Sequence, residues 1–237
     1  MKITMIGHST VLIELEGQKI LTDPYFSSTG NLAYARPMPP ARTCEELVDV
    51  DLVLLSHMHF DHVDRHYFKA LPVDTPVIAP AQTAWLTKLR GARNVLGIKV
   101  WENREFDKVK VTAVPAKHLT FTVGYVIQGE GKSLYFAGDT FYGPFMMHIA
   151  RKYHLHAALL PVMTYRIAMT MGEKDAVRAV LTLKPKFVIP IHLGLTPRSS
   201  ILSRHESPEN FVKRLRDVGS LTQAIVLNEG ESWKGTR

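Results

Sequence analysis

The 237-residue chain has a single cysteine, Cys44, so it cannot form an internal disulfide and does not need an oxidising compartment. It also lacks any apolar run near the roughly 18 residues that a membrane span requires. Its first six residues are too short a hydrophobic stretch for a signal peptide. We therefore expect a cytoplasmic protein with no membrane span.

No residue class is present in great excess. Hydrophobic residues make up 46% and charged residues 22% of the chain, which excludes collagen-like, coiled-coil and largely disordered proteins. No change of composition and no flexible linker divides the sequence. We expect one domain that spans residues 1–237, which is long enough to bury a substantial core.

The charge balance is moderately basic, with 29 Lys and Arg against 22 Asp and Glu and a net charge of +7. A positive balance favours anionic partners. The basic residues are scattered, however, and the densest group, Lys213, Arg214 and Arg216, falls on an expected surface helix. We therefore expect a small, anionic substrate rather than nucleic acid. A homo-oligomer is compatible with the sequence.

Short apolar and β-branched runs separated by glycine predict strands at residues 3–6, 11–14 and 19–22, and a second strand-rich stretch at 94–136. Both halves end in alternating strands and helices, and the last strand is expected at 224–227. This pattern predicts an α+β fold, a four-layer αββα sandwich in which two mixed sheets pack face to face with helices outside. Residues 23–42, which contain four prolines, are expected to form a long loop beside the site.

The strongest functional signal is the run His57-Met-His59-Phe-Asp61-His62, at the end of an apolar strand. Imidazole and carboxylate groups at this density are typical of a first-row metal site. In an extended segment His57 and His59 can point the same way, whereas Asp61 and His62 turn toward a second position. The motif therefore predicts metal binding.

Three later residues are candidates to complete the metal sites. His118, Asp139 and His192 each follow an apolar strand, and Gly138 allows the backbone to turn next to Asp139. A single histidine is more often structural than a ligand, but the shared placement of these three residues favours a common site.

The sequence resembles the metallo-β-lactamase superfamily, whose HxHxDH signature is present as His57, His59, Asp61 and His62. It is most similar to the branch that contains ascorbate-6-phosphate lactonases and N-acylphosphatidylethanolamine phospholipase D. The similarity to this branch includes Gly7-His8, the Leu-Thr-Asp23-Pro turn and the Ala-Gly138-Asp139-Thr segment.

The resemblance implies two divalent metal ions, with zinc as the first expectation and manganese or iron as alternatives. It implies that one metal would be held by His57, His59 and His118. It assigns Asp61, His62 and His192 to the other metal, with Asp139 bridging the two. It also implies a hydrolase in which a water shared by the metals attacks as hydroxide, with catalytic roles for Asp61 and His62.

Other polar residues are weaker candidates. His8 and Asp23 are expected to support the ligands, with Asp23 hydrogen-bonded to a ligand histidine. Candidates to hold an anionic substrate are Arg36, Lys117, Tyr165 and Arg166. Surface or structural roles are expected for His66, His154 and His156.

The leading hypothesis is therefore a dinuclear metal-dependent hydrolase acting on a small, anionic ester, lactone or phosphodiester. The alternatives are a nucleic-acid-processing metallo-nuclease of the tRNase Z type, a non-catalytic nucleic-acid-binding module and a mononuclear iron dioxygenase. No inserted basic arm for grasping tRNA is evident in the sequence. β-Lactamase activity is disfavoured because a periplasmic enzyme would carry a signal peptide.

Overall fold

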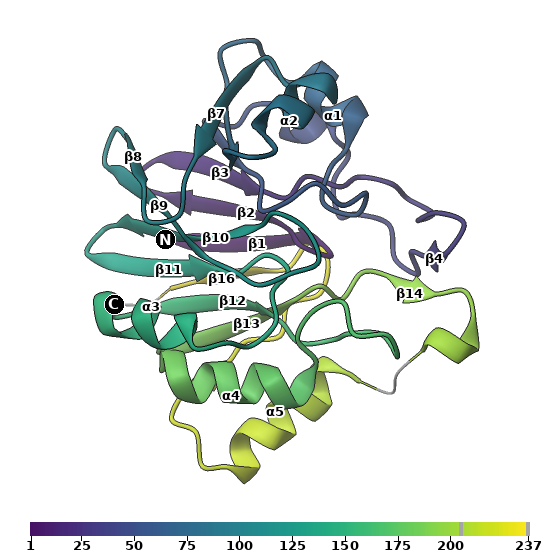
Figure 1. Ribbon diagram of the computed structural model, residues 1–237, viewed down its shortest axis with the longest axis vertical. Helices are drawn as coiled ribbons and strands as arrows, with labels where there is room; N and C mark the ends of the chain where they lie inside the picture. Colours follow the sequence, from purple (N-terminus) through teal and green to yellow (C-terminus); the bar gives the residue numbers. More distant parts are fainter. Residues whose placement is uncertain (204–205, 236–237) are drawn as a thin grey trace.

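A computed structural model describes residues 1–203 and 206–235. Two seven-stranded sheets form its centre, and helices cover the outer face of each sheet (Figure 1). This is the four-layer αββα sandwich predicted from the order of strands and helices. Within the described residues, no helix is both long enough and apolar enough to cross a bilayer.

The first sheet is built mainly from the N-terminal third of the chain. Its central strands β1, β2 and β3 are antiparallel, and β3, β5, β6 and β7 run parallel to one another. Its strands, in spatial order, are β16 (Ser232–Lys234), β1 (Lys2–Gly7), β2 (Thr10–Leu15), β3 (Gln18–Thr22), β5 (Leu52–Leu54), β6 (Pro76–Pro80) and β7 (Asn94–Ile98).

The second sheet contains the middle of the chain and the strands that follow it. An antiparallel half, β8 to β11, is joined to a parallel half, β11, β12, β13 and β15. Its strands, in spatial order, are β15 (Gln223–Ala224), β13 (Phe187–Ile191), β12 (Ala157–Pro161), β11 (Lys132–Phe136), β10 (Val123–Gly129), β9 (Val109–Pro115) and β8 (Asn103–Phe106).

Three apolar clusters hold the layers together. The largest lies between the sheets and includes Ile13, Leu54, Tyr125 and Phe136. A second packs the other face of the second sheet against three helices, and a third packs the first sheet against the helix at Arg65–Ala70 and the 3₁₀ turn at Glu45–Leu47. The helices are α1 (Arg65–Ala70), α2 (Ala84–Leu89), α3 (Phe145–Lys152), α4 (Glu173–Leu183) and α5 (Pro208–Asp217), with 3₁₀ turns η1 (Glu45–Leu47) and η2 (Ser200–Leu202).

The fold departs from the sequence expectations at its short strands. The expected final strand at 224–227 is wrong, because β15 ends at Ala224 and the last strand is β16, which pairs with β1 at the other sheet. The loop at residues 23–42 contains a two-residue strand, β4 (Tyr34–Ala35), which pairs with β14 (Thr196–Pro197). In Figure 1 this pair lies at one end of the molecule, beyond the ends of the sheets.

Gly138 brings the two sheets close together at the site. It follows β11 and has a φ of +56°, a conformation that L side chains rarely adopt. A Cβ at this position would lie 2.5 Å from Ser56 Cβ and 2.6 Å from Ser56 Oγ. Only glycine therefore lets the chain before Asp139 approach the chain before His57.

We predict that Gly138→Ala lowers the free energy of unfolding by about 2–4 kcal/mol, because backbone strain and overpacking add. Gly131→Ala is the matched control: Gly131 has a φ of +69° but no atom within 4 Å of its would-be Cβ. The control should lose only about 1–2 kcal/mol from the backbone conformation. Urea unfolding measures both, and equal losses would contradict the close approach.

Candidate metal centre

The candidate ligands come together from both sheets because each follows the end of a strand. His57 follows β5, His118 follows β9, and Asp139 and His192 follow β11 and β13. Tyr125 links the sheets beneath them, because its hydroxyl donates to the carbonyl of Leu55 at 2.8 Å. The residues singled out in the sequence thus gather at one place, although 135 positions separate His57 from His192.

The first donor group consists of His57, His59 and His118. One ring nitrogen from each lies within 4.8 Å of the others. His118 Nε2 is 3.0 Å from His59 Nδ1. The rings of His57 and His118 meet nearly edge to face, with centroids 4.8 Å apart.

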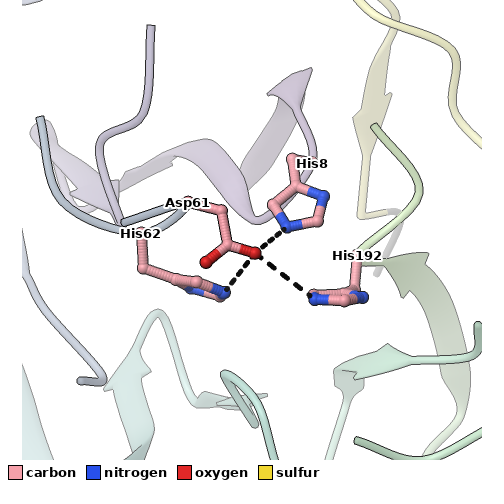
Figure 2. A group of neighbouring side chains, drawn as sticks. All are labelled: His8, Asp61, His62 and His192. Carbon is pink, nitrogen blue, oxygen red and sulfur yellow. Dashed lines mark hydrogen bonds and ion pairs between the residues drawn. The ribbon is translucent and has the colours of Figure 1, made fainter. Parts of the chain in front are cut away.

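The second donor group consists of Asp61, His62 and His192, joined by His8 (Figure 2). Contacts from all three histidines converge on one oxygen of Asp61. Its Oδ2 atom lies 3.3 Å from His8 Nε2, 4.0 Å from His62 Nε2 and 3.9 Å from His192 Nε2. All four residues are buried.

Asp139 lies between the two groups. Its Oδ2 atom is 3.2 Å from His192 Nε2 and 3.9 Å from His118 Nε2, and its Oδ1 atom is 3.5 Å from His62 Nε2. It therefore contacts members of both donor groups, which is the position that a bridging ligand requires.

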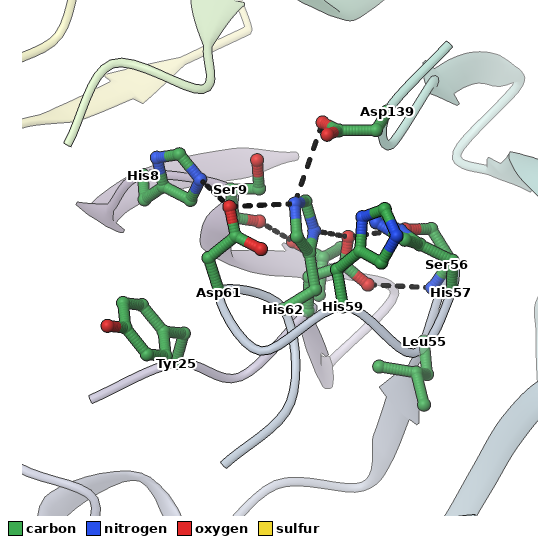
Figure 3. A network of polar contacts seen from close by, with 12 residues as sticks. His8, Ser9, Tyr25, Leu55, Ser56, His57, His59, Asp61, His62 and Asp139 are labelled. Carbon is green, nitrogen blue, oxygen red and sulfur yellow. Dashed lines mark hydrogen bonds and ion pairs between the residues drawn. The ribbon is translucent and has the colours of Figure 1, made fainter. Parts of the chain in front are cut away.

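A buried network behind the ligands fixes the protonation of two histidines. Asp23 accepts hydrogen bonds from His62 Nδ1 at 2.7 Å, from Ser56 Oγ at 2.6 Å and from the Ser56 backbone N–H at 2.6 Å. Ser56 Oγ is also 2.9 Å from His57 Nδ1. Since the Ser56 hydroxyl donates its proton to Asp23, His57 Nδ1 must donate to Ser56 (Figure 3 shows Ser56 beside His57). Both histidines thus carry a proton on Nδ1, which leaves Nε2 as the nitrogen that would bind a metal.

His8 links the turn after β1 to the segment after β13. Its Nδ1 atom accepts a hydrogen bond from the Gly194 N–H at 3.2 Å, so its Nε2 carries the proton and donates to Asp61. Its backbone carbonyl accepts from the His192 N–H at 3.0 Å. His8 and His192 both have positive φ, 60° and 66°. His8 therefore holds Asp61 and His192 in place relative to each other.

The donor set fits a metal centre. Among the described residues, four buried atoms of this set have no hydrogen-bond partner: His57 Nε2, His62 Nε2, His118 Nδ1 and Asp139 Oδ1. A buried polar atom without a partner is costly unless another group satisfies it. Three of these atoms are imidazole nitrogens and the fourth is a carboxylate oxygen, and both kinds of atom are ligands for first-row divalent metals.

The protonation states of His57, His118 and Asp139 suit metal binding. Burial lowers the pKa of His57 well below its usual value and lowers that of His118 to about 4. Burial opposes ionisation of Asp139, but His192 and His62 outweigh it and hold the pKa of this carboxyl well below its ordinary range. Neutral imidazoles and an ionised carboxylate are the forms that bind metal. Burial disfavours the charged forms of His62 and His192, but Asp139 and the neighbouring carboxylates outweigh it and raise the pKa of both, so a metal would displace a proton from each.

The weaker sequence candidates lie in different surroundings. Tyr165 is 9% exposed, and its ring centroid lies 6.1 Å from that of His192. Arg166 is exposed and donates to the carbonyl of Ile201 at 3.4 Å. Arg36 is buried and donates to the carbonyls of Tyr25, Ser27 and Met38 through Nε and Nη1, whereas its Nη2 atom has no hydrogen-bond partner among the described residues.

The remaining basic and histidine candidates lie outside the two donor groups. Lys117 is exposed. His66 lies on the surface and contacts Glu45 at 3.5 Å. His154 is exposed, and the ring of His156 packs against Phe187, with centroids 5.3 Å apart.

Two residues of the site were missed in the sequence. Ser56 precedes the HxHxDH motif and reads as an ordinary small residue, although a polar side chain directly after an apolar strand was a weak signal. A Cβ on Gly194 would lie 2.9 Å from the backbone nitrogen of His8. This glycine is therefore what allows the His192 segment to reach the first strand.

Comparison with known proteins identifies the family. Residues 2–192 match the model of the beta-lactamase superfamily domain. The chain is 30% identical to a UPF0173 metal-dependent hydrolase of Methanopyrus kandleri, over 99% of this chain and 100% of that protein. It is 34% identical to a UPF0173 metal-dependent hydrolase of Pelotomaculum thermopropionicum, over 98% and 99% of the two chains.

A solved structure supports the fold. The crystal structure of an isothiocyanate hydrolase from Delia radicum gut bacteria superposes with a TM-score of 0.82 at 21% identity, covering 99% of each chain. The chain belongs to the beta-lactamase superfamily and, within it, to the UPF0173 family of metal-dependent hydrolases. The superfamily and the hydrolase class predicted from the sequence are confirmed, whereas the lactonase and phospholipase branch stays a prediction.

We predict that Asp23→Asn weakens metal binding about 10- to 100-fold, because an amide cannot accept from Ser56 and His62 as a carboxylate does. His62 then loses its fixed tautomer. Competition with a chromophoric chelator measures the metal affinity.

Asp51→Asn is the matched control, since Asp51 is exposed and accepts a hydrogen bond from the Lys19 N–H. Thermal unfolding of both variants separates loss of affinity from loss of the fold. Wild-type affinity in folded Asp23→Asn would contradict the assigned role.

Proposed function

We propose that this protein is a dinuclear metal-dependent hydrolase of a small ester, lactone or phosphodiester. The observation that carries the proposal is the pair of donor groups, His57, His59 and His118 on one side and Asp61, His62 and His192 on the other. Asp139 contacts both groups, which supports its assignment as a bridge. Zinc is the first choice of metal, with manganese or iron as alternatives, because imidazole and carboxylate suit all three.

The metal ions, when bound, would lower the pKa of a coordinated water and polarise the bond under attack. The chain's own residues then orient the reaction. Burial disfavours the ionised form of Asp61, but His62 and the hydrogen bond from His8 outweigh it and lower the pKa of Asp61. Asp61 is therefore an ionised acceptor that orients the attacking group by accepting its hydrogen bond. His62, held by Asp23, completes the catalytic pair.

The reacting group of the substrate would be anionic or become so during the reaction. Two divalent ions carry four positive charges, against two from the carboxylates of Asp61 and Asp139, so the loaded centre attracts negative charge. Lactones and phosphodiesters both meet this requirement. The resemblance to ascorbate-6-phosphate lactonases and N-acylphosphatidylethanolamine phospholipase D supports the same choice. The single cysteine, which is free, supports a reducing cytoplasm as the proposed compartment.

The alternatives are less well supported. Membership in a family of metal-dependent hydrolases does not support a non-catalytic binding module. A mononuclear iron dioxygenase would use one metal, whereas the described residues offer two donor groups joined by Asp139. The nuclease alternative needs a surface that holds nucleic acid, and no sequence feature supplies one.

We predict about two zinc or manganese ions per chain in protein purified without chelator, and hydrolysis within a panel of lactones and phosphodiesters. His59→Ala should reduce both the metal content and the hydrolysis to background, since it removes a donor from the first group. Elemental analysis and a colorimetric phosphodiester assay measure these changes.

His154→Ala is the control, because His154 is an exposed histidine outside the two donor groups. It should keep wild-type metal content and turnover. A wild-type chain that retains no metal and takes up none on titration would overturn the proposal. One iron per chain with oxygen consumption would favour the dioxygenase instead.

A further inference from the structure

Three aromatic side chains from separate parts of the chain form a series of ring contacts that reaches the candidate metal centre, with Tyr165 buried at its inner end. The centroid of the Tyr34 ring lies 5.9 Å from that of Phe60 and 4.8 Å from that of Tyr165. The Tyr165 ring lies 6.1 Å from the ring of His192. We call Tyr34, Phe60 and Tyr165 the aromatic wall.

The wall is close to the reacting groups. Phe60 lies between His59 and Asp61 in the sequence, so the HxHxDH loop fixes its position beside the ligands, and its side chain is 44% exposed. Burial, followed by the negative charge of Asp61, raises the pKa of the hydroxyls of Tyr34 and Tyr165. The negative charge of Asp61 therefore acts on the hydroxyl groups of both tyrosines.

Tyr34 is held in place although it belongs to a long loop. Its strand β4 pairs with β14, so that Tyr34 lies opposite Pro197. Arg198 adds a second attachment, because its guanidinium donates to the carbonyls of Asn31 and Thr29. The Tyr34 N–H donates to the side chain of Asn31 at 2.8 Å. The wall is therefore preorganised by contacts between residues 23–42 and the segment after His192.

The arginines near the aromatic wall form hydrogen bonds with the backbone of the loops. The guanidinium groups of Arg36, Arg166 and Arg198 all donate to backbone carbonyls. The loops that bring in site residues expose apolar side chains instead: Leu119 and Phe121 follow His118, and Ile167 follows Arg166. Apolar side chains are thus exposed on the loops beside the candidate metal centre.

We propose that the aromatic wall binds a flat aromatic group of the substrate, next to the bond that is hydrolysed. This inference rests on the proposed function and adds the substrate class, an aryl-substituted ester, lactone or phosphodiester. Aromatic rings favour offset or tilted stacking at centroid distances of about 4.5–7 Å, the range in which the rings of the wall already meet. An aryl group can extend this series, whereas a saturated ring of similar size cannot.

The test compares phenylacetate with cyclohexylacetate, which share a carboxylate and a six-membered ring but differ in flatness. Calorimetric titration of the metal-loaded protein should show phenylacetate binding about 3- to 10-fold more tightly. The metal content of the same samples is measured by elemental analysis. The ratio of affinities tests the aromatic wall, whereas the metal content tests the metal centre.

Variants of the wall should remove this preference. Tyr34→Leu and Phe60→Leu keep apolar volume but lose a ring, so each should bring the ratio of dissociation constants close to one, whereas Tyr34→Phe should keep it. Trp85→Leu is the matched control, because Trp85 is a 60% exposed aromatic side chain on α2. Two wall variants are used so that disturbance of one loop does not decide the result.

The outcomes are distinct. Equal affinity for the two ligands in metal-loaded wild-type protein, or binding of neither, overturns the aromatic wall while the metal centre stands. A preference for phenylacetate in protein that holds no metal supports the wall and overturns the dinuclear hydrolase. A preference that persists in both leucine variants overturns the assignment to these residues.

Discussion

The buried carboxylate of Asp23 is the interaction on which the rest of the site depends. It is fully buried, and burial raises its pKa, so its ionised form survives only through the hydrogen bonds from Ser56 and His62. Those same bonds orient two imidazoles. The carboxylate therefore links the stability of the region to ligand geometry, since a change that frees Asp23 also frees His57 and His62.

Around this point the two sheets supply different parts of the centre. The first sheet contributes the HxHxDH loop and His8, and the second contributes His118, Asp139 and His192. Each donor group combines residues from both sheets, so neither sheet alone supplies a complete group. The face-to-face packing around Leu54 and Phe136 is thus a condition for metal binding as well as for stability.

Much of this arrangement could be predicted from the sequence because it follows from local patterns. The HxHxDH motif lies within six residues, and His118, Asp139 and His192 each follow an apolar run that reads as a strand. Ser56 and Gly194 could not be predicted, because their roles depend on contacts with Asp23 and His8 from distant parts of the chain. The short strands β4 and β16 were not predicted for the same reason, because pairing with distant strands forms them rather than the propensity of their own residues.

The hydrogen bond between Gly194 and His8 spans 186 positions. Synthesis of the chain from its N-terminus exposes the HxHxDH loop long before the second donor group is complete. A metal ion that met the nascent chain would find His57, His59, Asp61 and His62 without His118, Asp139 or His192. Both donor groups are therefore complete only after the strands that carry His118, Asp139 and His192 have been made and have packed against the first sheet.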